Sequence, residues 1–225
     1  MSTSLAHLAA IDLDGTILDG QSQRMFMRYL VRRRMAPLSL LIYVFGIFLL
    51  YGLGRKLDLS ALQKRVVATF RGFDDARLQA LFDDFTAIEV AGRIRPEARR
   101  EIGALVDQGV HVVIVSGSIA PLVARAGALV GIDHIVATKI APSRDGRNSG
   151  LVEGEMLAGK AKVEAIRAHA DFVHGPGRWV LWRAYGDHET DIELLSAADE
   201  AIAVCPTPGL ETVARARAWR VLNWA

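Results

Sequence analysis

The chain contains a single cysteine, Cys205, among its 225 residues. One cysteine cannot form an internal disulfide or a cysteine-based zinc cluster, which fits a reducing compartment. Cys205 itself is expected to be a small buried side chain at the end of a strand. Residues 1–10 lack the basic region and long apolar stretch that mark a secretory signal, so we expect a cytoplasmic start.

The chain also lacks a strong excess of charge, because its formal net charge at pH 7 is only +2. Nucleic-acid-binding domains usually carry a concentrated basic face, and this balance does not indicate one. In contrast, hydrophobic residues make up 51% of the chain. A chain of this length can bury one large core and a small extra module, so we expect one domain with an insertion.

From residue 96 onward, helix-like stretches and apolar runs alternate. The pattern predicts helices at 96–108, 121–130, 160–170, 190–197 and 210–218, and strands at 110–115, 134–137, 179–185, 201–204 and 220–222. A first strand is expected at 8–13 and a helix at 21–34, while the polar segment 139–152 should form a hairpin or flap. This alternation is typical of an α/β fold with a parallel sheet.

Polar motifs follow three of the predicted strands. They are Asp12-Leu13-Asp14-Gly15-Thr16, Ser116-Gly117-Ser118 and Gly186-Asp187. Ligands of open parallel sheets bind at the carboxyl ends of the strands, so Asp12, Ser116 and Asp187 should converge. Carboxylates can hold a divalent cation and offer a nucleophile, while a hydroxyl and an ammonium neutralise phosphate oxygens. With a lysine from the helix at 160–170, these residues indicate a phosphoryl-transfer site.

The two carboxylates of the first motif receive different roles. Gly15 permits a tight turn that keeps Asp12 and Asp14 close together. We expect Asp12 to attack phosphorus and form an aspartyl-phosphate. Asp14 would protonate the leaving oxygen and then activate water. Aspartate pairs are common in turns, so the weight of this interpretation comes from the other two strand ends.

The remaining motifs supply candidates for metal and phosphate binding. Asp187 is expected to be a metal ligand, and hard oxygen ligands of this kind suit Mg²⁺. Asp191 either orients the metal ligands or stabilises a helix N-terminus by about 0.3 to 1 kcal/mol. Ser116 and the Gly117 amide can donate to phosphate oxygens, although Ser116 could also be a simple helix cap.

Two lysines compete for the phosphate-binding role, Lys160 and Lys162. The segment that ends at Lys160 matches most of a nucleotide-binding P-loop, but Ala161 stands where a serine or threonine must hold Mg²⁺. Three histidines do not show a metal-ligand spacing and are expected to be surface or structural residues: His169, His174 and His188.

The motif at residues 12–16, Ser116, Lys162, and Asp187 with Asp191 resemble, in order and across nearly the whole chain, the four motifs of the haloacid dehalogenase (HAD) superfamily. The segment between Ala36 and Arg95 interrupts the alternation and has a mainly helical pattern. This insertion resembles the C1 cap of the branch that contains phosphoserine phosphatase, subfamily IB. The resemblance implies a Rossmann-like core and catalytic roles for Asp12, Asp14, Ser116 and Lys162. It also implies Mg²⁺ bound by Asp12, the main-chain carbonyl of Asp14 and Asp187. A Gly-x-x-Lys sequence supplies the phosphate lysine in that branch, which favours Lys162.

The chain departs from this branch at two positions. Phosphoserine phosphatases read the substrate ammonium with an acidic residue where this chain has Gln21, which weakens phosphoserine as the substrate. His188 replaces a small residue and could alter the surroundings of the metal. Gln21 is nevertheless, with Gly117 and Thr16, a candidate for substrate and phosphate binding.

The expected domains follow the insertion: residues 1–20 and 95–225 form the α/β core, and 21–94 form the helical cap. Caps of this kind exclude water and select the substrate. Residues 36–54 carry no charge and are long enough to span a bilayer. A single crossing would separate Asp12 from Ser116, however. The segment should therefore dock on a membrane surface, form a re-entrant hairpin or lie buried in the cap.

Basic residues flank this apolar segment and would each contribute about 1 kcal/mol at an anionic leaflet. They are Arg24, Arg28, Arg32, Arg33, Arg34, Arg55 and Lys56. Residues 26–34 and the apolar tract resemble the bacterial phosphatidylglycerophosphate phosphatases of the same branch, which implies a lipid phosphate at the inner membrane face. An ordinary apolar cap core or a dimer contact is the alternative.

The sequence thus predicts a Mg²⁺-dependent phosphomonoester phosphatase that acts on a lipid phosphate such as phosphatidylglycerophosphate. The alternative is a phosphatase of a soluble metabolite, with phosphoserine, histidinol phosphate or a sugar phosphate as candidates. A catalytically idle membrane-binding module is disfavoured by the intact set of motifs. We expect a cytoplasmic protein, peripheral on the inner face of the inner membrane, with no nucleic-acid partner.

Overall fold

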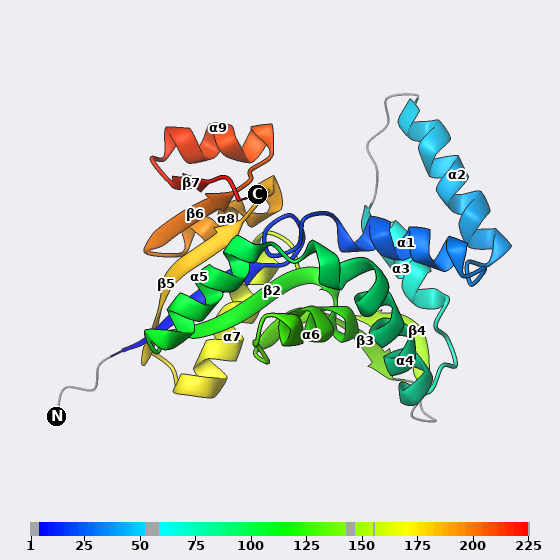
Figure 1. Ribbon diagram of the computed structural model, residues 1–225, viewed down its shortest axis with the longest axis horizontal. Coiled ribbons are helices and arrows are strands. Elements are labelled where there is room, and N and C mark those ends of the chain that lie inside the picture. Colours follow the sequence, from blue (N-terminus) through cyan, green and yellow to red (C-terminus); the bar gives the residue numbers. More distant parts are fainter. Residues whose placement is uncertain (1–4, 53–58, 143–146, 155, 225) are drawn as a thin grey trace.

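The computed structural model describes residues 5–52, 59–142, 147–154 and 156–224 (Figure 1). In this part of the chain, seven strands form one sheet in the order β4-β3-β2-β1-β5-β6-β7. They are β1 (Ala6–Asp12), β2 (His111–Ile119), β3 (Ile135–Pro142), β4 (Asn148–Glu153), β5 (Trp179–Gly186), β6 (Glu200–Val204) and β7 (Arg220–Leu222). All neighbours are parallel except β3 and β4, which are antiparallel. The expected α/β fold with a mostly parallel sheet is confirmed.

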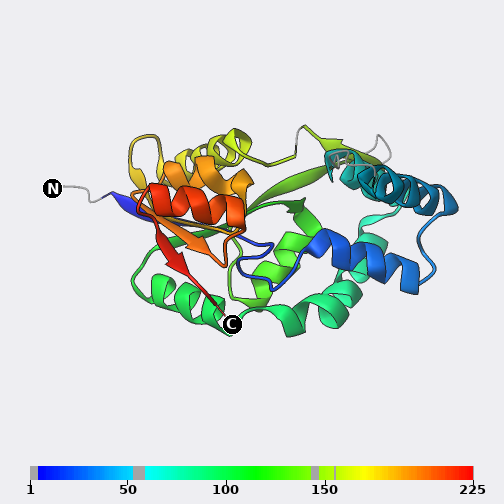
Figure 2. The same cartoon turned by 90° about the horizontal axis from the view of Figure 1, so that it is seen from above.

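Helices cover both faces of the sheet (Figure 2). In β1, Ala9 and Ile11 pack against one face cluster, and Leu8 and Ala10 pack against the other. Helices α5 (Pro96–Asp107) and α6 (Ala120–Leu129) cover the first face, and α7 (Lys160–His174), α8 (Ile192–Ser196) and α9 (Pro208–Ala216) cover the second. Because both faces of a parallel sheet are buried, its strands read as continuous apolar runs.

Element ends differ from the expected ones by a few residues. Helix α7 continues to His174 instead of ending at residue 170. The helix expected at 190–197 is divided into a 3-10 turn, Glu189–Asp191, and the short α8. The segment 139–152 takes part in the β3–β4 hairpin, as expected. Cys205 follows β6 as expected but is half-buried instead of buried, and its Sγ donates to the carbonyl of Trp224 at 3.2 Å.

The described part of the chain between β1 and β2 is mostly helical. It forms α1 (Ser22–Arg32), α2 (Leu38–Gly52), α3 (Leu59–Ala68) and α4 (Asp75–Phe85), then a π-helical turn, Thr86–Val90, and a 3-10 turn, Ala91–Arg93. The Asp74 side chain accepts the Arg77 N–H at 2.8 Å and so satisfies a free donor at the start of α4. The Gly72 N–H donates to the Asn148 carbonyl at 2.8 Å, so the hairpin lies against this helical segment.

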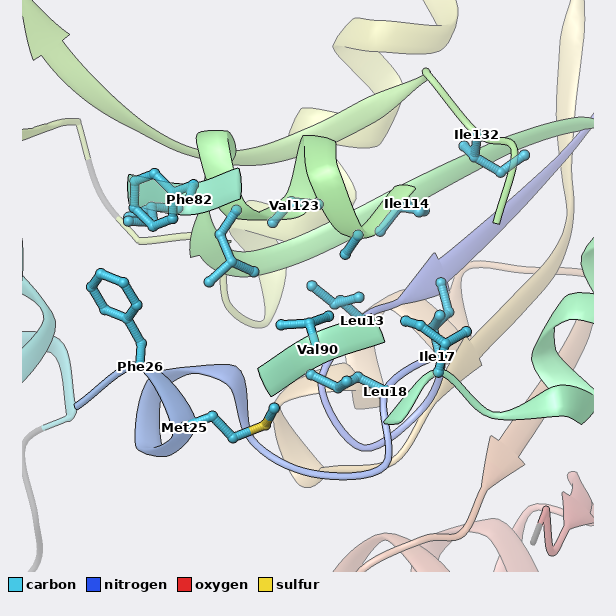
Figure 3. Packing of buried hydrophobic residues seen from close by; sticks show 14 of the residues in the cluster. Leu13, Ile17, Leu18, Met25, Phe26, Phe82, Val90, Ile114, Val123 and Ile132 are labelled. Atoms are coloured by element: carbon cyan, nitrogen blue, oxygen red, sulfur yellow. The ribbon is translucent and has the colours of Figure 1, made fainter. Parts of the chain in front are cut away.

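One apolar cluster joins these helices to the sheet (Figure 3). The ring centroid of Phe26 in α1 lies 5.2 Å from that of Phe82 and 4.8 Å from that of Phe85, both in α4. Leu13, which follows β1, and Ile114 of β2 belong to the same cluster. Full burial of a phenylalanine stabilises a fold by about 1.5 to 3 kcal/mol. The helical segment is therefore packed onto the sheet instead of being joined to it by a linker alone.

Helix α2 exposes apolar side chains. Leu38, Leu41 and Ile42 are 71%, 37% and 62% exposed, whereas Leu40 is buried. The side chains of Phe45 and Phe48, and residues 53–58 with Arg55 and Lys56, lie outside the described residues. Among the residues that are described, no helix combines the length and the apolar character required to cross a membrane.

Candidate active site

The carboxyl ends of β1, β2 and β5 meet at one edge of the sheet, because β1 lies between the other two strands. Asp12 ends β1, Ser116 lies in β2, and Asp187 directly follows β5. All three line one cavity of about 490 Å³, together with Asp14, Lys162 and Asp191. The structure therefore brings together the side chains that the sequence places at separate strand ends.

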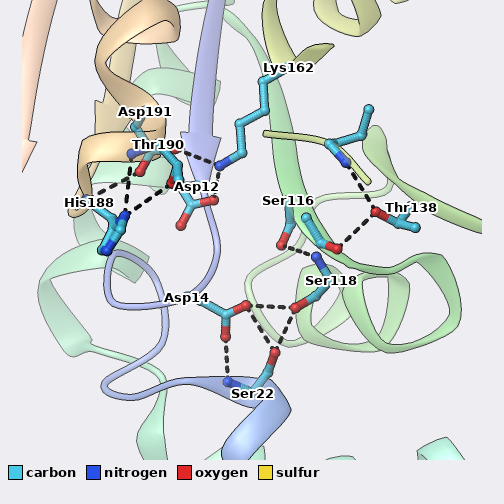
Figure 4. A network of polar contacts seen from close by, with 12 residues as sticks. Asp12, Asp14, Ser22, Ser116, Ser118, Thr138, Lys162, His188, Thr190 and Asp191 are labelled. Carbon is cyan, nitrogen blue, oxygen red and sulfur yellow. Dashed lines mark hydrogen bonds and ion pairs between the residues drawn. The ribbon is translucent and has the colours of Figure 1, made fainter. Parts of the chain in front are cut away.

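Lys162 contacts two of these carboxylates (Figure 4). Its Nζ lies 2.5 Å from Asp12 Oδ1 and 2.6 Å from Asp191 Oδ1. Burial alone would lower the pKa of Lys162, but the two carboxylates outweigh burial and raise it, so the ammonium stays charged. Lys160, the competing lysine, is exposed and is not among the residues that line the cavity.

The cavity holds more negative charge than Lys162 neutralises. Burial raises the pKa of Asp12 well above its usual range, Lys162 opposes that rise, and Asp191 adds to it. Burial, followed by the charges of Asp191 and Asp14, raises the pKa of Asp187 to about 7. Each of these carboxyl groups is thus harder to ionise while its neighbours are charged.

This set of residues fits a divalent cation. Carboxylate oxygens of Asp12, Asp187 and Asp191 lie within 4.8 Å of one another, and all three residues are buried. Hard oxygen ligands suit Mg²⁺, and a cation would offset the surplus of negative charge. A Cβ added at Gly15, whose φ is +78°, would lie 1.9 Å from Asp187 Oδ2. Only glycine therefore allows Asp187 to approach this turn so closely.

The carboxylate of Asp14 is held by hydrogen bonds from two serines. It accepts from the Ser22 N–H at 2.5 Å, the Ser22 hydroxyl at 2.9 Å and the Ser118 hydroxyl at 2.7 Å (Figure 4). Burial raises the pKa of Asp14, and these hydrogen bonds oppose the rise. A raised pKa favours the protonated carboxyl that a general acid needs. The sequence does not predict either serine, because Ser22 resembles an ordinary helix-start residue.

The segment from Ser116 to Ser118, at the carboxyl end of β2, is held in place by hydrogen bonds. The Ser116 hydroxyl accepts the Ser118 N–H at 3.0 Å, and the Gly117 carbonyl accepts the Thr138 hydroxyl at 2.8 Å. A Cβ on Gly117 would lie 2.9 Å from the carbonyl oxygen of Leu157, so a larger residue would displace one of the two segments. These contacts position the Ser116 hydroxyl and the backbone of this segment at the cavity.

The helical segment supplies one side of the cavity. Gln21, Gln23 and Lys64 line it. Gln23 donates to Gln63 Oε1 at 3.1 Å, and Gln63 donates to the Gly117 carbonyl at 2.8 Å. These two bonds connect α1 and α3 to the segment from Ser116 to Ser118. The sequence gives no signal for Gln63, because the bond joins segments that are 54 positions apart.

Two candidate residues have contrasting surroundings. Thr16 is fully buried and does not line the cavity, and its hydroxyl has no hydrogen-bond partner among the described residues. His188 does line the cavity, and its ring nitrogen accepts the Thr190 N–H at 3.3 Å. The structure thus brings His188, but not Thr16, to the site.

Comparison with known proteins agrees with this fold. The family model of haloacid dehalogenase-like hydrolases matches residues 9–196. The phosphoserine phosphatase SerB1 of Mycobacterium tuberculosis (strain ATCC 25618 / H37Rv) is 27% identical over 98% of this chain and 71% of its own length. The histidinol-phosphatase of Neisseria meningitidis serogroup C (strain 8013) is 23% identical over 98% of this chain and 100% of its own.

Solved structures share the whole fold. A protein of unknown function from Bordetella pertussis Tohama I has a TM-score of 0.86 and 24% identity, covering 97% of this chain and 99% of its own. A phosphoserine phosphatase solved as a phospho-aspartyl intermediate analogue has a TM-score of 0.62 and 20% identity, covering 98% and 94%. The chain belongs to the haloacid dehalogenase-like hydrolases and is a phosphatase of that family.

Proposed function

We propose that this phosphatase is Mg²⁺-dependent and hydrolyses a phosphomonoester through phosphorylation of Asp12. The observation that carries the proposal is the position of Asp12. Its buried carboxylate lies 2.5 Å from the Lys162 ammonium, at the edge of a cavity that Ser116 also lines. A carboxylate held beside a phosphate-binding cation can reach phosphorus without a change in the fold.

In the first step, the Ser116 hydroxyl, the Gly117 N–H and the Lys162 ammonium stabilise the charge on the phosphate oxygens. A carboxylate oxygen of Asp12 attacks phosphorus, and the bond from phosphorus to the leaving oxygen breaks. Asp14 donates its proton to that oxygen, which leaves as an alcohol. The product at this stage is an aspartyl-phosphate on Asp12 and an ionised Asp14.

In the second step, Asp14 accepts a proton from water, and the water oxygen attacks the phosphorus of the aspartyl-phosphate. The bond between Asp12 and phosphorus breaks, which restores both carboxyl groups and releases inorganic phosphate. The hydrogen bonds from Ser22 and Ser118 keep Asp14 in one orientation for both proton transfers. A single carboxyl group can serve as acid and then as base because the first step leaves it ionised.

Three groups would hold Mg²⁺: the carboxylates of Asp12 and Asp187 and the main-chain carbonyl of Asp14. When bound, Mg²⁺ supplies positive charge that stabilises the phosphate oxygens in the transition state. Asp191 has a separate role in this arrangement, because its contact with Lys162 fixes the ammonium beside Asp12.

The helical side of the cavity favours a leaving group that is neutral or negatively charged. Gln21, Gln23 and Lys64 come from this side. The carboxylates among the described residues that line the cavity come from β1 and from the segments that follow β1 and β5. An amine on the substrate would thus meet amides and an ammonium there. Relatives named phosphoserine phosphatase and histidinol-phosphatase support a soluble metabolite as the first substrate class. Because the esters in those names carry an amine that this side of the cavity does not match, we expect a soluble ester without an amine.

A lipid phosphate is the second candidate, supported by the exposed apolar residues Leu38 and Ile42 of α2. An anionic lipid headgroup would also suit Lys64. However, the basic residues before α2 are less available to an anionic membrane surface than the sequence indicates. Arg28 and Arg32 both bind Glu89, at 3.1 and 2.9 Å. The soluble class is therefore the first choice.

The experiment is Mg²⁺-dependent phosphate release from soluble phosphomonoesters and from phosphatidylglycerophosphate in mixed micelles. Asp12→Asn should lower kcat at least about a thousand-fold, because the nucleophile is lost while its shape is kept. Comparable activity in Asp12→Asn would exclude the mechanism. Lys64→Met should raise KM for esters with a second negative charge and leave KM for neutral esters unchanged. Preference for the micellar substrate would favour the lipid class.

A further inference from the structure

Four histidines gather at the end of the sheet opposite the candidate active site. His111 begins β2, His134 precedes β3, and His169 and His174 lie in α7. The ring centroids of His111 and His134 are 4.2 Å apart, and those of His111 and His174 are 4.8 Å apart. His111 and Ser116 lie five positions apart along β2, which is about 17 Å in an extended strand. This cluster therefore does not belong to the phosphate cavity.

Ring nitrogens of three of these histidines, one from each of His111, His134 and His169, lie within 4.8 Å of one another. His111 Nε2 lies 3.4 Å from His169 Nε2. Two nitrogens bound to Zn²⁺ at about 2.0–2.1 Å with a tetrahedral angle lie roughly 3.4 Å apart. The separation between His111 Nε2 and His169 Nε2 thus matches the spacing of two ligands on one metal ion.

The second nitrogen of His111 is also occupied. Its Nδ1 lies 2.8 Å from His174 Nε2. Histidines that bind a metal usually donate their other N–H to an acceptor, and that bond fixes the ring and its tautomer. If His111 Nδ1 donates to His174, then His111 Nε2 presents its lone pair toward His169. His174 is therefore a positioning residue for His111.

The surroundings of the cluster keep the central ring uncharged. Burial, followed by the charges of the other imidazoles, lowers the pKa of His111 to about 4, and burial lowers the pKa of His169 as well. The exposed carboxylate of Asp133 lies 3.7 Å from His134 Nε2 and adds one negative charge at the rim. Neutral imidazole is the form that binds a metal.

We propose that His111, His134 and His169 form a second metal site, for Zn²⁺ or another divalent ion that prefers nitrogen ligands. Imidazole suits Zn²⁺, Cu²⁺ and Ni²⁺, whereas the carboxylates of the active site suit Mg²⁺, so ligand chemistry separates the two sites. The His134 side chain is 48% exposed, which gives an ion a path from solvent. A bound ion joins β2, the start of β3 and α7, the helix that carries Lys162.

The test uses protein without a polyhistidine tag, stripped with a chelator and then titrated with Zn²⁺ in excess Mg²⁺. Calorimetry should show one equivalent of Zn²⁺, and Zn²⁺ should raise the melting temperature. Co²⁺ in its place should give visible absorption bands typical of tetrahedral nitrogen ligation. His169→Gln should weaken Zn²⁺ binding at least about a hundredfold, and His174→Gln about ten- to a hundredfold.

Matched variants make the result decisive. His7→Gln removes a histidine that packs against Trp182 outside the cluster, and it should bind Zn²⁺ like the wild type. Asp187→Asn alters the carboxylate site and should also leave Zn²⁺ binding unchanged. If the His169→Gln variant does not fold, the His134→Gln variant takes its place, because the His134 side chain is half-exposed. Equal Zn²⁺ affinity in the wild type and the His134→Gln variant, or loss of binding in Asp187→Asn, would overturn the proposal.

Discussion

At the scale of single residues, the proton transfers depend on how Asp14 is held. Ser118 donates to Asp14 Oδ2 at 2.7 Å, and the hydroxyls of Ser22 and Ser118 lie 2.8 Å apart. Ser118→Ala removes one donor without touching the nucleophile. We expect kcat to fall about tenfold with little change in KM, because the proton donor becomes less well oriented. Steady-state kinetics on the preferred substrate measure this.

The control for that prediction is Ser196→Ala, which removes an exposed hydroxyl that contacts Ile192 and Arg217 and does not line the cavity. Asp14→Asn provides a second check. In that background Ser118→Ala should have almost no further effect, since both changes act on the same proton transfer. A full additional loss would show that Ser118 acts on something other than Asp14.

Asp187 makes Mg²⁺ binding depend on pH. Its pKa rises from the ordinary 3.8 to about 7, chiefly through burial. This favours the protonated form in the folded state. Without metal, its contribution to stability is therefore fully present below 3.8 and is lost as pH rises to 7. Below pH 7, Mg²⁺ must displace a proton, so its apparent dissociation constant should rise up to about tenfold per pH unit.

Thermal unfolding with and without Mg²⁺ measures this dependence. Mg²⁺ should raise the melting temperature more at pH 8 than at pH 6, at constant ionic strength. The metal-free Asp187→Asn variant should lose less stability between pH 5 and pH 8 than the wild type does. Equal stabilisation by Mg²⁺ at both pH values would contradict the raised pKa of Asp187.

Some of these residues could be predicted from sequence, and others could not. Asp12, Ser116 and Asp187 could, because the ends of parallel strands share one edge of the sheet. Ser118 and Gln63 could not be assigned roles, since their partners lie far away in the chain. The histidine cluster could not be predicted from the sequence for the same reason. His169 and His174 show no ligand spacing alone, because His111 comes from β2 and His134 from the segment just before β3.

At the scale of elements, α2 distinguishes the two substrate classes. Its Leu38 and Ile42 are largely exposed, and a membrane surface would cover them. If the lipid class is correct, changing Leu38 and Ile42 to Ser should reduce binding to anionic vesicles severalfold. Vesicle cosedimentation and hydrolysis of the micellar substrate measure this.

The matched control is Phe172→Ser in α7, because Phe172 is 88% exposed and belongs to a helix outside the insertion. It should bind vesicles like the wild type. If the wild type does not bind vesicles, or if the variant with Leu38 and Ile42 changed to Ser binds them as the wild type does, α2 has no membrane role. In that case a soluble substrate would be favoured.

Element ends were the less predictable part of the fold. The strand and helix types follow from the periodicity of apolar residues, and the sheet order agrees with them. The helix expected at 190–197 begins instead with a 3-10 turn, because His188 accepts the Thr190 N–H while Asp191 accepts the His188 N–H. Such reciprocal caps depend on side-chain geometry, which the apolar pattern does not contain.

At the scale of the whole molecule, the insertion and the sheet share one apolar cluster. Phe26 and Phe82 come from the insertion, Leu13 and Ile114 from the segments that form the sheet and its first loop, and all four are buried together (Figure 3). Further bonds join the same parts, such as Gln63 to Gly117. The division into an α/β core and a helical cap stays a prediction, and the shared cluster shows that the two parts are packed together. We expect the two parts to unfold together, because neither buries its apolar face alone.

Phe82→Ala tests this coupling. Phe82 is fully buried, so its truncation should lower the free energy of unfolding by about 3 to 5 kcal/mol and the melting temperature by roughly 6 to 20 °C. Scanning calorimetry should show one transition in both wild type and variant, whereas Phe172→Ala, at an exposed position, should change little. Two separate transitions in the wild type would mean that the insertion folds independently. One transition that moves as a whole would mean that the insertion and the sheet form one cooperative unit.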